Sequence, residues 1–161
     1  MNTLLETQLK RAKVAARLLK NMPTCTKNQA LDKIADALIA HSEEILEANK
    51  KDMAHAKEVN MTKAMQDRLL FTHERIVGVS DGVKKVATLP DPIGEVMESW
   101  TRPNGLEISK VRVPIGVFGI IYEARPNVTV DIASLCLKSG NACVLRGGKE
   151  AIHTNKKLVE V

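Results

Sequence analysis

The sequence has very few aromatic residues and no long apolar segment. Phenylalanine, tryptophan and tyrosine together make up 2% of the residues, whereas proteins that bind single-stranded nucleic acids stack bases on aromatic side chains. No apolar run approaches the roughly 20 residues of a membrane-spanning helix. The N-terminal segment mixes charges among its apolar positions, unlike a signal peptide. We therefore expect a cytoplasmic protein that binds neither nucleic acids nor membranes.

Cysteines and histidines are also scarce, and their spacing matches no metal site. The three cysteines, Cys25, Cys136 and Cys143, form no C-x-x-C pair, and the four histidines show no H-E-x-x-H spacing. We therefore expect no bound metal. The odd number of cysteines and their mostly apolar surroundings favour reduced thiols packed in the interior.

The remaining composition is that of an ordinary globular domain, with 44% hydrophobic residues, 27% charged residues and a net charge of +5. Residues 1–92 are expected to form a helical region, because apolar residues recur there at spacings of three and four. A capping box that begins at Thr26 predicts the start of a second helix, which continues to about Lys50. Thr62 and Thr72 are expected to cap two later helices.

The pattern changes after residue 92. Residues 93–113 contain two extended runs joined by the turn sequence TRPNG, which predicts a β-hairpin. Residues 114–161 begin with the apolar run Ile115–Tyr122, which predicts a strand buried on both faces; a helix, a second strand and another helix follow. This order predicts an α/β fold that opens a parallel nucleotide-binding sheet. Because two parallel strands do not form a stable sheet, we expect an incomplete sheet and further residues after Val161.

Two segments follow the carboxyl ends of the predicted parallel strands, where sheets of this type bind ligands. In the first segment, Arg125 offers a forked cationic donor, and Asn127 is either an amide donor or a helix cap. With the free N–H groups of the next helix, these side chains suit an anion or a developing oxyanion. The alternative is a surface ion pair between Arg125 and Glu123 beside an ordinary helix start.

The second segment has the position that meets the adenosine ribose in a dinucleotide site. Its glycines allow the backbone to approach a ligand closely, and its basic residues favour the 2′-phosphate of NADP, while its acidic residue could reach a ribose hydroxyl. The alternative is a simple Gly-Gly turn with solvated charges. The candidate cofactor-binding residues are Arg146, Gly147, Gly148, Lys149 and Glu150.

The sequence resembles the γ-glutamyl phosphate reductases, or glutamate-5-semialdehyde dehydrogenases, of the aldehyde dehydrogenase superfamily. The most distinctive string is VPIGVFGIIYEARPNVTVDIASLCLKSGNA, and the helical segments ALDKIADAL and EILEANKKDM are also similar. The resemblance covers essentially the whole chain. It implies the N-terminal portion of an aldehyde dehydrogenase-like oxidoreductase that reduces γ-glutamyl phosphate to glutamate 5-semialdehyde with NADPH, in proline biosynthesis.

The resemblance also implies roles for individual residues. Arg125 would bind the substrate, Asn127 would donate to an oxyanion or shape its loop, and residues 146–150 would hold NADP(H). The hairpin at 93–113 would help to bridge the subunits of a homo-oligomer. The family's catalytic cysteine lies in the later half of its chains, and none of the three cysteines here matches its motif. The alternative function is a catalytically inactive module that binds a nucleotide or a partner subunit.

Overall fold

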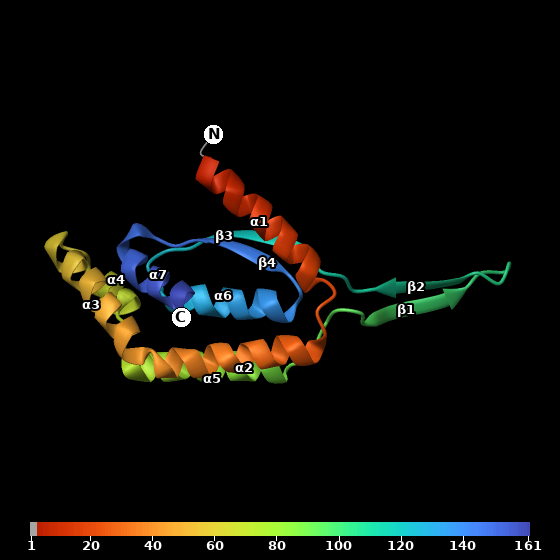
Figure 1. Cartoon of the computed structure of the whole chain (residues 1–161), viewed down its shortest axis with the longest axis horizontal. Coiled ribbons are helices and arrows are strands. Elements are labelled where there is room, and N and C mark those ends of the chain that lie inside the picture. The colour runs from red at the N-terminus through yellow and green to blue at the C-terminus, as the bar shows by residue number, and fades with distance from the viewer. Residues whose placement is uncertain (1–2) are drawn as a thin grey trace.

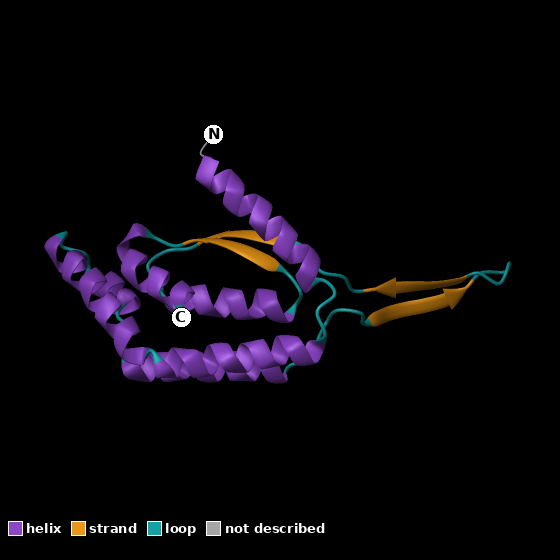
Figure 2. Ribbon diagram, viewed as in Figure 1, coloured by secondary structure: helices purple, strands orange, loops and turns teal. Residues whose placement is uncertain are grey.

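The computed structural model describes residues 3–161, and Figures 1 and 2 show their arrangement. None of the helices in this range is long and apolar enough to cross a membrane. The elements in chain order are α1 (Thr3–Leu19), α2 (Thr24–Ala40), α3 (Ser42–Glu58), α4 (Lys63–Leu69), α5 (His73–Thr88), β1 (Val96–Thr101), β2 (Glu107–Val111), β3 (Val117–Ile121), α6 (Asn127–Lys138), β4 (Ala142–Arg146), the 3-10 helix η1 (Lys149–Ala151) and α7 (Ile152–Glu160).

The first turn of α2 differs from the sequence prediction. The helix begins at Thr24, directly after Pro23, and no side chain caps it. Thr26 therefore lies inside the helix, and the predicted capping box is wrong. Pro23, with φ −59° and ψ 145°, directs the chain into the helix at the next residue because its ring fixes φ.

The prediction of one long second helix is also wrong, because the chain forms two helices that meet at His41. This residue, with φ −103° and ψ 20°, ends α2 and precedes α3. The turn lets α2 pack along α5 while α3 packs against α7. The two predicted caps are confirmed: Thr62 accepts from the N–H of Met65 at 3.4 Å, and Thr72 accepts from that of Arg75 at 3.2 Å.

The body of the molecule is layered. Helix α1 lies over one face of the β3–β4 pair, α6 lies on the other face, and α2 and α5 pack side by side beyond α6 (Figure 1). The main core lies between α2, α5 and α6, whose apolar positions face one another, and α3 and α7 add to it. Its buried residues are Leu31, Ala35, Leu38, Ile45, Phe71, Ile76, Val83, Ala87, Val130 and Leu158.

The predicted β-hairpin is confirmed. Strands β1 and β2 pair antiparallel, from Val96 opposite Val111 to Thr101 opposite Glu107. The hairpin projects away from the body (Figure 2), and every residue of β1 is exposed. The hairpin is therefore an exposed arm that is joined to the body at its root.

Strands β3 and β4 pair in parallel, as predicted, from Val117 beside Ala142 to Ile121 beside Arg146. The expectation that the first of these strands is buried on both faces is wrong. Ile121 is 81% exposed, and Gly119 is also exposed. These residues approach the carboxyl end of β3, where the described helices leave one face of the strand uncovered.

Candidate functional site

The two segments singled out in the sequence lie side by side at the carboxyl ends of β3 and β4. The N–H of Tyr122 donates to the carbonyl of Arg146 at 3.1 Å. A Cβ atom on Gly148 would lie 3.5 Å from the backbone nitrogen of Ala124. The parallel pairing thus brings together the two segments, as the fold predicts for neighbouring strands.

The first segment opens into a polar cavity of about 480 Å³. Arg125, Asn127 and Asp131 line it from the start of α6, while α4 and α5 contribute other charged residues. This second wall was not predicted from the sequence, because α4 and α5 have the pattern of ordinary amphipathic helices and nothing in their spacing indicates a cavity shared with residue 125. The charged residues of the second wall are Asp67, Arg68 and Arg75.

Asn127 does not cap the helix. The residue before α6 is Pro126, and no side chain makes a capping hydrogen bond there, so the capping alternative is wrong. Instead, Nδ2 of Asn127 donates to Oδ2 of Asp131 at 2.9 Å, one turn along α6. Because an amide nitrogen carries two hydrogens, this bond fixes the side chain and leaves a second donor.

Arg125 is exposed, and its position differs from the surface ion pair considered above. Its backbone N–H donates to the carbonyl of Glu123 at 2.8 Å. Within residues 3–161, however, its guanidinium makes no ion pair with Glu123 or with any other carboxylate. The side chain is therefore a free cation at the cavity wall, next to the fixed amide of Asn127.

The guanidinium of Arg75, on the opposite wall, already has partners within the chain. Its Nη2 lies 2.9 Å from Oδ1 of Asp67, and its Nη1 donates to the carbonyl of Leu70 at 2.6 Å. These bonds tie the end of α4 to the start of α5. Arg75 therefore organises the wall, and its charge is partly neutralised by Asp67.

The second segment has two exposed cations, Arg146 and Lys149, and neither forms an ion pair among the described residues. Its two glycines lie close to the ends of neighbouring side chains. A Cβ on Gly147 would overlap the Nδ2 of Asn155, and one on Gly148 would overlap the Oε2 of Glu150. The segment therefore offers free positive charge beside two glycines, which allow close approach of the backbone to a ligand.

A buried network holds this segment against α3. The carboxylate of Asp52, which is 2% exposed, accepts from the backbone N–H of His153 at 3.1 Å and of Thr154 at 2.8 Å. These are free donors of the first turn of α7, which a carboxylate stabilises. Asn49 donates to Oγ1 of Thr154 at 3.1 Å. The network therefore fixes the chain just after residue 150.

The three cysteines lie outside the polar cavity. Cys136 is buried and Cys143 is half-buried, as expected, but Cys25 is exposed, so the prediction of an interior thiol is wrong for that residue. It lies near the exposed start of α2. Burial raises the pKa of Cys136 to about 11 and also raises that of Cys143. Neither buried thiol is activated as a nucleophile, since the thiolate is the reactive form.

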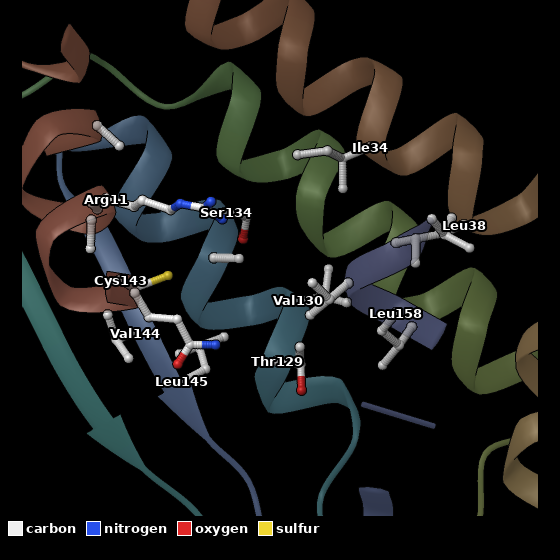
Figure 3. A pocket seen from close by; sticks show the side chains of 17 residues that line it. Arg11, Ile34, Leu38, Thr129, Val130, Ser134, Cys143, Val144, Leu145 and Leu158 are labelled. Atoms are coloured by element: carbon white, nitrogen blue, oxygen red, sulfur yellow. The ribbon is translucent and has the colours of Figure 1, made fainter. Parts of the chain in front are cut away.

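A second cavity, of about 740 Å³, lies beside the edge of β4 that faces away from β3. Figure 3 shows Cys143, Val144 and Leu145 on β4 and Val130 on α6 among the residues that line it. In the described part of the chain, no strand pairs with this edge. The cavity thus combines an unpaired strand edge with an apolar lining.

Comparison with known proteins identifies close relatives, although no family model matches the chain. The γ-glutamyl phosphate reductase of Moorella thermoacetica is 55% identical over 163 residues, which cover 100% of this chain and 39% of that protein. The γ-glutamyl phosphate reductase of a Geobacillus species is 58% identical over 147 residues, or 91% of this chain and 36% of that protein.

The chain is homologous to the γ-glutamyl phosphate reductases. It spans 36–39% of the length of these curated relatives and corresponds to their N-terminal portion. The crystal structure of γ-glutamyl phosphate reductase from Thermotoga maritima matches 97% of this chain and 38% of that chain, with a TM-score of 0.95 and 46% identity. A probable aldehyde dehydrogenase from Listeria monocytogenes matches with a TM-score of 0.72 at 15% identity. The aldehyde dehydrogenase-like fold predicted from the sequence is thereby confirmed.

Proposed function

We propose that this chain is the amino-terminal part of a γ-glutamyl phosphate reductase that uses NADPH. The reaction converts γ-glutamyl phosphate, NADPH and a proton into glutamate 5-semialdehyde, phosphate and NADP⁺. The single observation that carries the proposal is the similarity to curated reductases along the whole chain, at 55% identity. The polar cavity supports it, because a free cation and a fixed amide donor lie together at the carboxyl end of β3.

The proposed roles follow from the free donors of each side chain. Arg125 binds an anionic group of the substrate, because its guanidinium has no partner among residues 3–161. Asn127 uses its second N–H to stabilise the oxyanion that develops on the attacked carbonyl. Its bond to Asp131 holds the amide in place beforehand, so that no reorganisation is needed during the reaction.

The nucleophile in this proposal is a cysteine that the chain does not supply. Cys136 and Cys143 have raised pKa values because of burial, and Cys25 is exposed at the start of α2. None of the three lines the cavity that contains Asn127. By itself, the chain is then expected to show no turnover.

The cofactor segment fits a phosphate-bearing dinucleotide. Arg146 and Lys149 are exposed and unpaired within residues 3–161, so they can bind the 2′-phosphate that distinguishes NADP from NAD. Gly147 and Gly148 let the backbone approach the cofactor closely, and Glu150 can reach a ribose hydroxyl. When bound, NADPH supplies the hydride that reduces the acyl carbon.

The chain also divides by proposed role. Residues 1–92 form the helical part of the cofactor-binding domain, 93–113 form an arm that bridges subunits, and 114–161 form the first strands and helices of the cofactor-binding sheet. Exposed apolar side chains support the bridging role, since Trp100 is 44% exposed and Val96 is 56% exposed. We place the enzyme in the cytoplasm, where cysteines such as these three remain reduced.

The proposal is tested by joining residues 1–161 to the remaining part of the Moorella reductase; we call this protein the chimeric reductase. NADPH formation is measured with glutamate 5-semialdehyde, phosphate and NADP⁺. The chimeric reductase should turn over and the 161-residue chain should not. Asn127→Ala should lower kcat by a factor of about 10²–10³. Arg125→Ala should instead raise the KM of the substrate whose anionic group Arg125 binds, which is either glutamate 5-semialdehyde or phosphate.

A matched control for Asn127→Ala is Asp81→Asn, at an exposed position of α5. It should leave both kinetic constants unchanged. A chimeric reductase that folds and unfolds cooperatively but forms no NADPH would contradict the proposal. If Asn127→Ala retained full kcat and only lowered the melting temperature, the residue would have a structural role instead.

A further inference from the structure

Arg68 and Asp131 line the polar cavity and have no direct part in the proposed function. Arg68, from α4, lines the cavity and is exposed. Arg75 is held by Asp67 and by a backbone carbonyl, but the guanidinium of Arg68 has no hydrogen bond or ion pair with any other residue from 3 to 161. It is therefore free to bind a carboxylate through two parallel hydrogen bonds.

Asp131 is the second of these side chains. It is half-buried on α6, and its Oδ2 accepts from Asn127. Its other oxygen, Oδ1, receives no hydrogen bond from the described part of the chain. An ionised carboxylate has about four acceptor sites, so Asp131 can hold Asn127 and still bind a cation in the cavity.

We propose that the polar cavity binds the amino-acid end of the substrate, with Arg68 on the α-carboxylate and Asp131 on the α-ammonium. This inference rests on the proposed function, which supplies a substrate that carries both groups at the end opposite its acyl phosphate. The cavity volume of about 480 Å³ is within the range of small-molecule pockets. Its walls carry charges of both signs, which match a zwitterionic group.

The consequence is selection for an α-amino acid. A site that is built to pair with a polar group rejects analogues that lack the group, because its own charges are then left unpaired. Two aldehydes separate the contribution of the α-ammonium to binding from that of the α-carboxylate. 5-Oxopentanoate lacks the α-ammonium of glutamate 5-semialdehyde, and 4-aminobutanal lacks its α-carboxylate. Arg68 should select against 4-aminobutanal, and Asp131 should select against 5-oxopentanoate.

The test uses the chimeric reductase with Arg68→Gln and Asp131→Asn. Asparagine at 131 keeps an oxygen that can accept from Asn127, so this variant removes the charge and retains the acceptor. Each variant should lower kcat/KM for glutamate 5-semialdehyde about ten- to hundredfold, the range of a lost charge-assisted contact. Arg68→Gln should leave kcat/KM for 4-aminobutanal unchanged, and Asp131→Asn should lower kcat/KM much less for 5-oxopentanoate than for glutamate 5-semialdehyde.

In the direction of NADPH formation, phosphate is a substrate separate from the aldehyde. The KM of phosphate therefore distinguishes an arginine that binds the phosphoryl group from one that binds the α-carboxylate. Arg68→Gln should not change the KM of phosphate; an increase confined to phosphate would assign Arg68 to the phosphoryl group and overturn the inference. Equal losses with all three aldehydes would also overturn it, since that result indicates a structural role. Arg17→Gln, at an exposed position of α1, is the matched control.

The two proposals fail in different ways. A chimeric reductase that folds but is inactive without any further substitution would overturn the proposed function, and the inference with it. An active chimeric reductase whose selectivity is unaffected by both variants would overturn the inference alone. Ligand-observed NMR with the 161-residue chain provides a second measurement: L-glutamate should bind more tightly than glutarate, and equal binding of the two would contradict the role of Asp131.

Discussion

Replacing Asp91 by alanine is expected to destabilise the fold strongly, because a buried cation then loses its partner. Nζ of Lys27 lies 2.8 Å from Oδ2 of Asp91, and the two side chains are only 1% and 10% exposed. Thr24 donates to the same oxygen at 2.8 Å, and the N–H of Ile93 donates to Oδ1 at 3.0 Å. The carboxylate thus joins the start of α2 to the root of the hairpin.

The expected magnitude comes from this burial. Removing one partner of a buried ion pair costs about 3–5 kcal/mol, and we expect a loss in this range for Asp91→Ala. Lys27→Met combined with Asp91→Ala removes the buried cation as well, so the double variant should recover most of the loss. As a control, the exposed pair of Lys84 and Asp36, 3.2 Å apart, should contribute at most about 1 kcal/mol.

The assay is urea unfolding of the 161-residue chain, followed by circular dichroism at pH 7. If the double variant were as unstable as Asp91→Ala, the buried charge would not be the cause, and the reasoning would be refuted. A loss no larger than that of the exposed control pair would refute it as well.

The same carboxylate predicts a pH dependence. Burial raises the pKa of Asp91, but hydrogen bonds from Lys27, Ile93 and Thr24 outweigh this effect and hold the pKa below its ordinary value of 3.8. Because the folded-state pKa is the lower one, the stabilisation is present above pH 3.8 and is lost as the pH falls through the folded-state pKa. Asp91→Asn should therefore lose less stability on acidification below this pH than the unmodified chain does.

Three further predictions concern the thiols, the cofactor and the open sheet edge. Iodoacetamide at pH 8 should modify the exposed Cys25 and spare Cys136 until the chain is unfolded, as mass spectrometry of the peptides would show; early modification of Cys136 would contradict its burial. In the chimeric reductase, neutral residues at Arg146 and Lys149 should lower kcat/KM for the NADP couple about ten- to hundredfold and that for the NAD couple much less, whereas equal losses would show that the segment does not contact the 2′-phosphate. The unpaired edge of β4 should cause the 161-residue chain to self-associate, and a monomer by light scattering at all concentrations would argue against this.

Apart from the division between α2 and α3, the sequence was sufficient to predict the order of the α-helices and strands. The period of the apolar residues changes near residue 92, and strong turn residues mark the boundaries. Thr62 and Thr72 cap their helices as predicted. The division at His41 could not be predicted, since the apolar pattern continues through it. The turn there is set by packing on two different partners, α5 and α7.

The candidate site was predictable in part for a similar reason. Arg125 and Asn127 follow a strand, so a general rule for parallel sheets identifies their position. Arg68 lies nearly 60 residues earlier in the sequence, on a helix whose pattern indicates only packing, and it contacts the cavity because of the tertiary fold. The bond between Asn127 and Asp131 has the spacing of one helical turn, so that contact could have been anticipated from the sequence.

The hairpin leaves and re-enters the body at one point. The N–H of Gly94 donates to the carbonyl of Arg112 at 3.0 Å, and the N–H of Arg112 donates to that of Glu95 at 3.0 Å. The length of the hairpin at 93–113 can therefore change during evolution without disturbing the helices and strands of the body. Matched additions, with one residue on each strand, preserve the pairing, whereas a single added residue shifts the register and exchanges the two faces. Among related proteins, we therefore expect the arm to differ in length by even numbers of residues, while the segments on either side of it keep their spacing.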